Sequence, residues 1–233
     1  MERRDSTPSR KRPERYPGYP AERLTLDLSG EPSLQDVPIP DGPWEIHGQP
    51  LPTLETTQQV REAGYQTDAS GRPLHPWARL LLSSEHGGTP TGKGAYWHWG
   101  PNKTADPIVV TSELRPRILL IERSDTGALA LPGGFVDQGE DPLLCAYREL
   151  KEETGLEVSQ EGTLVYQGPV ADLRTTLHAW AETSAYLFTV ETASEVKGDD
   201  DAISAQWYFL DELPNTLFGS HADLVKMALK TTP

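Results

Sequence analysis

The stretch from Gly133 to Val158 constrains the fold of this chain more than any other part of the sequence. It reads GGFVDQGEDPLLCAYRELKEETGLEV, a glycine-rich turn followed by a segment with a helix signal at each end. Asp141 can cap the N-terminus, Pro142 suits the first helical position, and Gly155 suits the position after the last turn. These signals predict a helix over about residues 142–153.

This helix would carry an apolar face and an acidic face. The apolar side chains at helical spacing, which predict packing on a core, are Leu143, Tyr147 and Leu150. Glu149, Glu152 and Glu153 follow at i, i+3 and i+4, so their carboxylates share another face, which we expect to be exposed to solvent. Such hard oxygen ligands suit Mg²⁺ or Mn²⁺, because the cation relieves the repulsion between like charges. For the glutamates alone, a solvated acidic face is the competing interpretation.

The spacing of the whole stretch favours the metal interpretation. Gly134 is followed after five residues by Glu140 and, after seven more, by the run RELKEETGL from Arg148 to Leu156. This pattern resembles a complete Nudix box. The resemblance implies a strand–loop–helix unit that places divalent ions, Mg²⁺ or alternatively Mn²⁺, against a diphosphate joined to another chemical group.

The resemblance also implies roles for residues in the box. The implied metal ligands, one of which would also orient or deprotonate the attacking water, are Glu149, Glu152 and Glu153. Glu140 and Arg148 are implied to brace the loop against the helix. We also expect Gly133 at the metal site, because a glycine lets the backbone approach where a Cβ would obstruct it.

Composition narrows the function classes. A chain of 233 residues accommodates one domain of about 150 residues and a smaller one. The net charge of -14 argues against a protein that holds a nucleic-acid backbone, and leaves a small nucleotide bound with Mg²⁺ as the expected partner. The one cysteine, Cys145, excludes a disulfide within the chain, and we expect it to pack near the core.

Hydropathy predicts a soluble protein. No apolar run approaches the length of a membrane span, and the N-terminus lacks the apolar core of a secretory signal, so we expect no membrane partner. The cytoplasm is the expected location, since the single cysteine fits a reducing compartment. A mitochondrial transit peptide is the weaker interpretation, because the basic N-terminus also contains acidic residues.

Three parts are predicted along the chain. Residues 1–15 are basic and nearly free of apolar side chains, which predicts a disordered tail. Residues 16–106 are rich in Pro and Gly and predict a small loop-rich subdomain, with one helix from Thr53 to Ala63. We expect its tryptophans to anchor a small core, and we interpret the segment GKGAYWHWG in the same way. Residues 107–233 are predicted to form the main domain.

The main domain has the pattern of alternating strands and helices. Apolar and β-branched runs predict strands over residues 117–122, 128–131, 164–167, 180–190 and 205–210. A last helix is predicted from His221 to about Leu229, with Ser220 as its cap. Strands covered by helices on both faces predict an α/β protein, an α/β/α sandwich with a mixed sheet. The Nudix resemblance implies the same fold, here preceded by the loop-rich subdomain.

A second resemblance narrows the family. The segments WGPN at 99–102 and ADPI at 105–108 are similar to the junction in front of the Nudix core in ADP-ribose pyrophosphatases, a branch related to an ADP-ribose-sensing channel domain. The resemblance implies Mg²⁺-dependent hydrolysis of ADP-ribose to AMP and ribose 5-phosphate. Two alternatives remain open. One is another nucleoside diphosphate derivative as substrate, such as NADH or a dinucleoside polyphosphate, and the other is a sensor that binds ADP-ribose without cleaving it.

The same branch implies substrate contacts outside the box. The residues implied to contact the nucleotide are Asp172, Arg174, Thr175, Phe218, Ser220 and His221. An acidic loop, implied to provide an additional ligand or a general base, contains Asp199 and Asp200. From the residues alone, three other interpretations stand beside these: Arg174 as a surface arginine paired with Asp172, a solvated acidic turn, and a solvent-facing His221.

Overall fold

The computed structural model describes residues 24–34, 50–83, 89–172, 174–214 and 216–231. Within these ranges the chain forms a small antiparallel pair, β1 (Leu24–Leu26) with β2 (Pro32–Leu34), and a seven-stranded mixed sheet. The central strands of this sheet follow the order β5-β4-β3-β8-β7, while β6 pairs with β3 and β9 pairs with β4. The predicted tail over residues 1–15 lies outside the described residues.

Two long strands form the centre of the sheet. β3 (Gly100–Thr111) and β8 (Ala179–Val190) pair in parallel along their whole length, from Gly100 opposite Ala179 to Thr111 opposite Val190. The predicted boundary between residues 106 and 107 lies inside β3. The polar residues and prolines at the start of β3 lack the apolar pattern of a strand. They form a strand nevertheless, because they pair with β8.

The remaining strands, apart from β6, confirm the predicted positions, with shifts at their ends. They are β4 (Arg117–Arg123), β5 (Leu129–Ala130), β6 (Gly134–Phe135), β7 (Thr163–Pro169) and β9 (Ala202–Phe209). β9 begins earlier than predicted because residues 202–204 continue its antiparallel pairing with β4. The two-residue strand β6 was not predicted, and it attaches the start of the box to β3.

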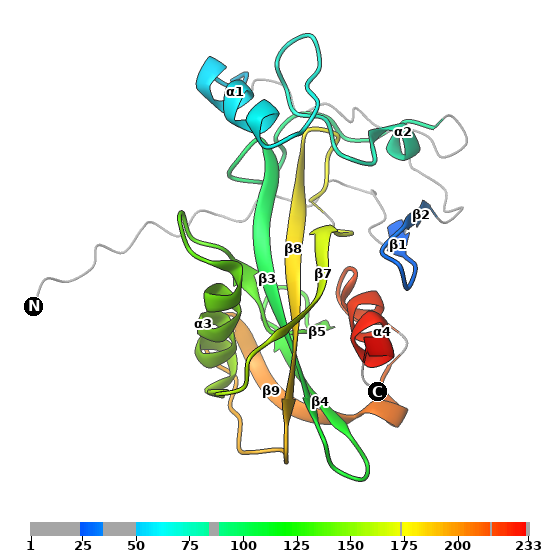
Figure 1. Ribbon diagram of the computed structural model, residues 1–233, viewed down its shortest axis with the longest axis vertical. Coiled ribbons are helices and arrows are strands. Elements are labelled where there is room, and N and C mark those ends of the chain that lie inside the picture. The colour runs from blue at the N-terminus through cyan, green and yellow to red at the C-terminus, as the bar shows by residue number, and fades with distance from the viewer. Residues whose placement is uncertain (1–23, 35–49, 84–88, 173, 215, 232–233) are drawn as a thin grey trace, which may run out of the picture.

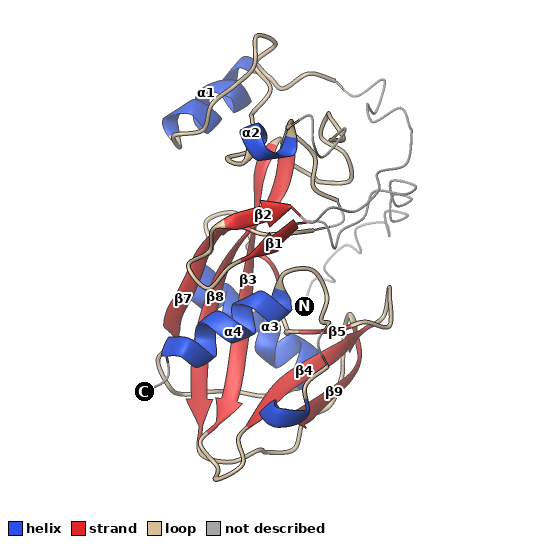
Figure 2. Cartoon of the chain, turned by 90° about the vertical axis from the view of Figure 1, so that its right-hand side faces the viewer, coloured by secondary structure: helices blue, strands red, loops and turns tan. Residues whose placement is uncertain are grey.

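Helices cover both faces of the sheet, which confirms the predicted α/β/α sandwich (Figure 1, Figure 2). On one face, α3 (Pro142–Thr154) buries Cys145, Ala146 and Leu150 in an apolar cluster with Val109 and Leu119. On the other face, α4 (His221–Thr231) packs residues such as Leu224, Val225 and Ala228 into a second cluster. The sheet therefore separates two cores, and the box helix belongs to only one of them.

The ends of α3 lie where the sequence predicts them. The Asp141 side chain accepts a hydrogen bond from the backbone N–H of Leu143 at 2.8 Å, and Pro142 occupies the first turn. Gly155 adopts a left-handed conformation with φ of 69°, and its N–H bonds to the carbonyl of Lys151. Three local signals thus fix the helix that carries the glutamates.

The part that precedes β3 contains two helices, α1 (Leu54–Glu62) and α2 (Ala78–Leu81), joined by loops (Figure 1). Tyr65 connects it to the central sheet, since its hydroxyl donates to the carboxylate of Glu182 on β8 at 2.7 Å. The indole Nε1–H of Trp180 donates to the same carboxylate at 3.2 Å. Among the described residues, no helix is both long enough and apolar enough to cross a membrane.

The tryptophans of this part differ in their environment. Trp77 is half-buried against the core cluster that contains α4 residues. Trp97 instead exposes 50% of its surface, so the prediction that it anchors a core is wrong. It lies in a loop just before β3 rather than between two packed elements. Trp44 lies outside the described residues.

Candidate active site

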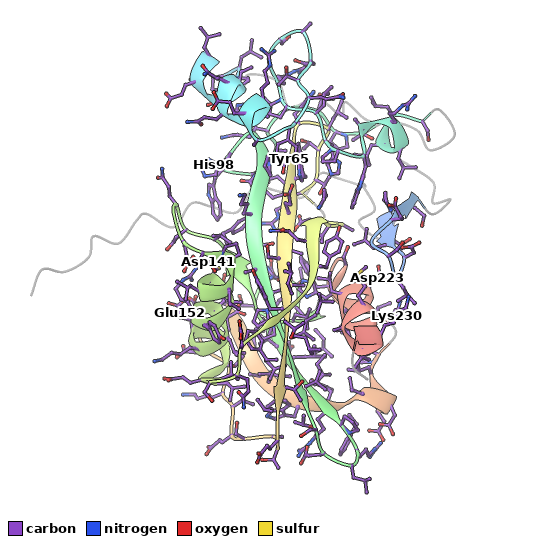
Figure 3. The ribbon with its side chains drawn as sticks, viewed as in Figure 1. Tyr65, His98, Asp141, Glu152, Asp223 and Lys230 are labelled. Carbon is purple, nitrogen blue, oxygen red and sulfur yellow. The ribbon has the colours of Figure 1, made fainter. Side chains whose placement is uncertain are left out.

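Two of the three box glutamates are buried between α3 and the glycine turn. Glu149 exposes 9% of its surface and Glu153 only 3%, whereas Glu152 is exposed. The expectation of a solvent-facing cluster is therefore wrong for Glu149 and Glu153, which are one helical turn apart and both face the turn at Gly133 and Gly134. Figure 3 labels Asp141 at one end of α3 and Glu152 further along it.

Burial changes the acidity of these carboxyl groups. It raises the pKa of Glu153 to about 8, even though the carboxylate accepts a hydrogen bond from the N–H of Gly133 at 2.9 Å. It also raises the pKa of Glu149, against the opposing effect of hydrogen bonding from Arg148. A cation placed beside these two groups would favour their ionised forms.

The glycine turn leaves no room for side chains. A Cβ at Gly134 would collide with the carboxylate of Glu149. A Cβ at Gly133, where φ is +149°, would lie 2.5 Å from both the carbonyl oxygen of Ala105 and the carboxylate of Asp106. The turn is therefore pressed between α3 and β3, which brings its backbone to the carboxylates.

Asp106 stands behind this turn, and sequence reasoning missed it as part of the site. It is buried, and its carboxylate accepts a hydrogen bond from the hydroxyl of Thr183 on β8 at 2.5 Å. The ADPI segment contains Asp106, but the pairing of β6 with β3 sets the distance between Asp106 and the box. No local sequence pattern predicts this pairing. Only the folded sheet places Asp106 against Gly133.

Arg148 links the box together. Its Nε and Nη2 donate to the two carboxylate oxygens of Glu140, each at 2.9 Å, and these bonds lower the pKa of Glu140 to about 2. Its Nη1 donates to Glu149 at 2.6 Å and to Glu152 at 3.0 Å. The structure thus brings Glu140 and Arg148 together, and it adds a bridge between two of the expected metal ligands that the sequence did not indicate.

This bridge decides how the carboxylates are arranged. In the described part of the chain, no three His, Cys, Asp or Glu side chains form a group that could hold a metal ion as they stand. The guanidinium of Arg148 holds Glu149 and Glu152, while Glu153 holds the Gly133 N–H. The donor set, carboxylate oxygens with two raised pKa values, nevertheless fits a hard divalent cation.

The acidic loop lies beside the box carboxylates. The N–H of Asp199 donates to the carbonyl oxygen of Glu153 at 3.2 Å, which ties the loop to the end of α3. The Asp199 carboxylate accepts from the N–H of Asp200, which adopts a left-handed conformation with φ of 52°. Burial and the nearby charges of Asp201 and Glu152 raise the pKa of Asp200. Asp199 therefore stabilises the turn through its hydrogen bonds, and Asp200 interacts electrostatically with Glu152 of the box.

Asp172 and Arg174 form a close ion pair. The guanidinium of Arg174 donates to both oxygens of Asp172, at 2.8 and 2.6 Å. Burial disfavours the charged form of Asp172, but its hydrogen bonds with Arg174 outweigh this effect and hold its pKa below the ordinary value. The pairing of a partly exposed Arg174 with Asp172 is therefore present, with 37% of the Arg174 side chain exposed. The pair presents one fixed guanidinium beside the rings of Tyr96 and Phe135.

Two buried hydroxyl groups adjoin this pair. Tyr96 and Thr175 lie next to each other and close to Asp172. Neither the Tyr96 hydroxyl nor the Thr175 Oγ1 has a partner in hydrogen-bond geometry among the described residues. Sequence reasoning selected Thr175 and missed Tyr96, which stands in the GKGAYWHWG segment.

The structure places Phe218, Ser220 and His221, which lie before and at the start of α4, in different environments. His221 accepts a hydrogen bond at Nδ1 from the N–H of Leu131 at 2.8 Å, and burial lowers its pKa, so the alternative of a solvent-facing histidine is wrong. Ser220 was predicted to cap α4, but its hydroxyl accepts from the N–H of Ala171 at 2.8 Å. Phe218 packs edge-on against His221 and beneath the guanidinium of Arg123.

This geometry agrees with the comparison to known protein families. A NUDIX domain matches residues 101–227, more than half of the chain. The chain belongs to the NUDIX family. The matched region begins within β3 and ends within α4, so it contains the box, the acidic loop and the Asp172–Arg174 pair.

Individual relatives of this Nudix chain include ADP-ribose pyrophosphatases. The mitochondrial ADP-ribose pyrophosphatase of Rattus norvegicus is 30% identical over 197 residues, covering 68% of this chain and 53% of that protein. The ADP-ribose pyrophosphatase of Methanocaldococcus jannaschii is 36% identical over 115 residues, covering 47% of this chain and 64% of that protein. The matched region spans about half to two thirds of the length of these relatives.

A solved structure shows the same fold. A MutT/nudix family protein from Enterococcus faecalis superimposes with a TM-score of 0.50 at 21% identity, covering 78% of this chain and 74% of that one. At this identity the likeness concerns the fold alone. It confirms the Nudix architecture of the sheet and its helices.

Proposed function

We propose that this Nudix chain hydrolyses the diphosphate bond of ADP-ribose to give AMP and ribose 5-phosphate. The observation that carries the proposal is the burial of Glu149 and Glu153 against the backbone of Gly133 and Gly134, in a chain related to ADP-ribose pyrophosphatases. A buried anionic cluster needs a cation, and a diphosphate is the kind of substrate that such a cation would bind. We propose Mg²⁺ as that cation, with Mn²⁺ as the alternative.

The residues that would hold the ion are the box glutamates with the backbone at Gly133. When bound, the ion supplies positive charge to the diphosphate oxygens and lowers the pKa of water. Because the ion would also favour the ionised form of Glu153, this buried carboxylate is suited to accept a proton from the attacking water. Asp200 stands beside the same carboxylates and is the second candidate for this role.

Other residues would hold and orient the substrate. The guanidinium of Arg174, kept in place by Asp172, offers a charge-assisted contact to phosphate or ribose oxygens. The Thr175 hydroxyl is buried and has no partner in hydrogen-bond geometry within the described ranges, so it is suited to the same task. With Nδ1 occupied by Leu131, His221 carries its proton on Nε2 and can donate from there, while Ser220 and Phe218 fix the loop around it.

A coupled assay tests the reaction directly. Purified protein is incubated with ADP-ribose and Mg²⁺, with and without EDTA, and AMP and ribose 5-phosphate are measured by chromatography. Phosphatase is added to a second portion only after the reaction has been stopped and excess Mg²⁺ restored, and the inorganic phosphate that it releases is measured. EDTA-sensitive release of AMP and ribose 5-phosphate is the expected result. A panel with NADH and dinucleoside polyphosphates identifies another substrate if ADP-ribose is cleaved poorly. Tight binding of ADP-ribose without cleavage would identify a sensor and contradict the proposed reaction.

Substitution of Glu153 tests the assignment of the box. We expect Glu153→Gln to lower kcat by about 100-fold or more, because the amide cannot accept the proton. The variant should remain folded, since the amide oxygen can still accept the hydrogen bond from Gly133. Glu157→Gln is the matched control, because Glu157 pairs with Lys151 on the exposed end of the same segment. Near-normal turnover in Glu153→Gln would show that the carboxylates have been misassigned.

A further inference from the structure

Trp97 is a large aromatic residue with an unexplained exposed ring. Half of its surface is open to solvent, although its ring also packs edge-on against Phe135 with 4.4 Å between centroids. Its backbone is held in place, since Lys93 Nζ donates to the Trp97 carbonyl at 3.2 Å. An apolar ring kept at the surface in this way has a free face but little freedom of its own.

Phe135 connects Trp97 directly to the box. Gly134 and Phe135 are consecutive residues of β6, so they face opposite sides of the strand. Gly134 faces Glu149, whereas the Phe135 side chain packs toward the core cluster that contains Tyr96. The Phe135 carbonyl oxygen accepts a hydrogen bond from Arg148 at 3.2 Å. The ring against which Trp97 packs thus belongs to the residue after Gly134, and it lies on the opposite side of β6 from Glu149.

Arg174 lies on the same side. Its guanidinium carbon is 5.3 Å from the centre of the Phe135 ring and 5.1 Å from the centre of the Tyr96 ring. These contacts join Trp97, Phe135, Arg174 and the buried Tyr96 into one cluster of flat groups, which we call the aromatic wall. The wall offers exposed π-surface at Trp97 and a positive charge at Arg174 that is fixed by Asp172. It meets the box at the Phe135 carbonyl oxygen, which accepts from Arg148.

We propose that Trp97 is a substrate-binding residue that stacks on the nucleobase of the substrate. The proposal rests on the proposed function, which supplies a nucleoside diphosphate as the ligand class. A nucleobase is joined to its diphosphate through one ribose, and the wall includes Phe135, which follows the Gly134 that contacts Glu149 and whose carbonyl oxygen accepts from Arg148 of the box. Stacking is satisfied by any planar base, and an exposed indole is the side chain best suited to it.

Binding measurements with the two halves of the substrate test this role. Trp97→Ala, Trp97→Phe and wild-type protein are titrated in a calorimeter with AMP and, separately, with ribose 5-phosphate, in the presence of Mg²⁺. Loss of one base stack should weaken AMP binding by about 5- to 150-fold in Trp97→Ala. Ribose 5-phosphate has no base, so its binding should not change. Trp97→Phe should fall between Trp97→Ala and the wild type for AMP.

His98→Ala is the matched control. His98 is exposed and adjacent in the same loop (Figure 3), and the backbone N–H that it donates to Asn102 is retained in the variant. We expect wild-type affinity for both ligands in this control. The proposal would be overturned if Trp97→Ala left AMP affinity unchanged or weakened AMP and ribose 5-phosphate binding equally. It would also be overturned if His98→Ala weakened AMP binding to a similar extent, or if the wild type did not bind AMP. Selective loss of AMP affinity in a protein that does not cleave ADP-ribose would support the wall and reject the proposed reaction.

Discussion

At the scale of single residues, buried titratable groups carry the chemistry of this molecule. Glu153 is nearly inaccessible, accepts a hydrogen bond from the backbone and has a pKa near neutrality because of its burial. For His75, in the part that precedes β3, burial changes the pKa in the opposite direction. Its Nδ1 accepts from the N–H of Trp77 at 3.0 Å, its Nε2 is buried without a partner among the described residues, and burial lowers its pKa to about 3.

His75 makes stability depend on pH. The lowered pKa means that the unfolded chain binds a proton more readily between about pH 3 and 6.5, so this contribution to stability is complete above pH 6.5 and is lost as the pH falls. Between pH 7 and 5, wild-type protein should lose about 2 kcal/mol more unfolding free energy than His75→Gln. Urea denaturation at both values measures the difference. His98→Gln, at an exposed histidine, should follow the wild type, and identical losses in all three proteins would contradict the prediction.

Residue identities in the box could be predicted from the sequence, but residue environments could not. The positions of Glu140, Arg148 and Glu153 follow from spacing along one chain segment. The burial of Glu153 depends on the acidic loop and on the turn at Gly133, which reach α3 only through the folded sheet. The same reason explains why Asp106 escaped notice and why Trp97 was expected to be buried.

At the scale of elements, the strand–loop–helix unit from β6 to α3 places the carboxylates. Its helix could be predicted almost to the residue because Asp141, Pro142 and Gly155 are local signals. The two-residue strand β6 could not, because it exists only by pairing with β3. Local chemistry thus fixed the helix, and the sheet fixed its distance from the glycine turn.

The fit of this unit can be tested with Gly134→Ala. The added methyl group meets the Glu149 carboxylate and must displace it, so kcat/KM should fall by about 100-fold. Stability should also fall, by about 1–3 kcal/mol, as in other overpacked sites. Steady-state kinetics with ADP-ribose and urea denaturation measure the two effects.

Asp141→Ala provides the contrasting case in the same unit. Loss of the cap should lower the free energy of unfolding by about 1 kcal/mol and leave kcat/KM close to the wild-type value, because Asp141 is remote from the carboxylates along α3. If both variants lose activity only in proportion to their stability, the close contact between Gly134 and Glu149 has no specific role in positioning.

At the scale of the whole molecule, Tyr65 joins the part before β3 to the sheet. Tyr65→Phe removes the hydroxyl that donates to the Glu182 carboxylate, which should lower the unfolding free energy by about 1.5–3 kcal/mol. Tyr147→Phe is the matched control, because its hydroxyl bonds to a neutral backbone carbonyl at Gln160 on the exposed side of α3. Urea denaturation should show a smaller loss of unfolding free energy in Tyr147→Phe than in Tyr65→Phe. Equal losses would mean that the hydrogen bond to Glu182 stabilises the fold no more than a bond to a neutral carbonyl.

The parallel pair of β3 and β8 has a mechanical consequence. The two strands extend side by side from the loops near Gly100 to Thr111, past the carboxylate site (Figure 1). Bending between Gly100 and the β6 pairing at Thr104 and Ala105 would have to deform both strands at once. The paired strands therefore resist movement of their two ends relative to each other, and we expect opening around a substrate to involve loops and side chains outside the pair.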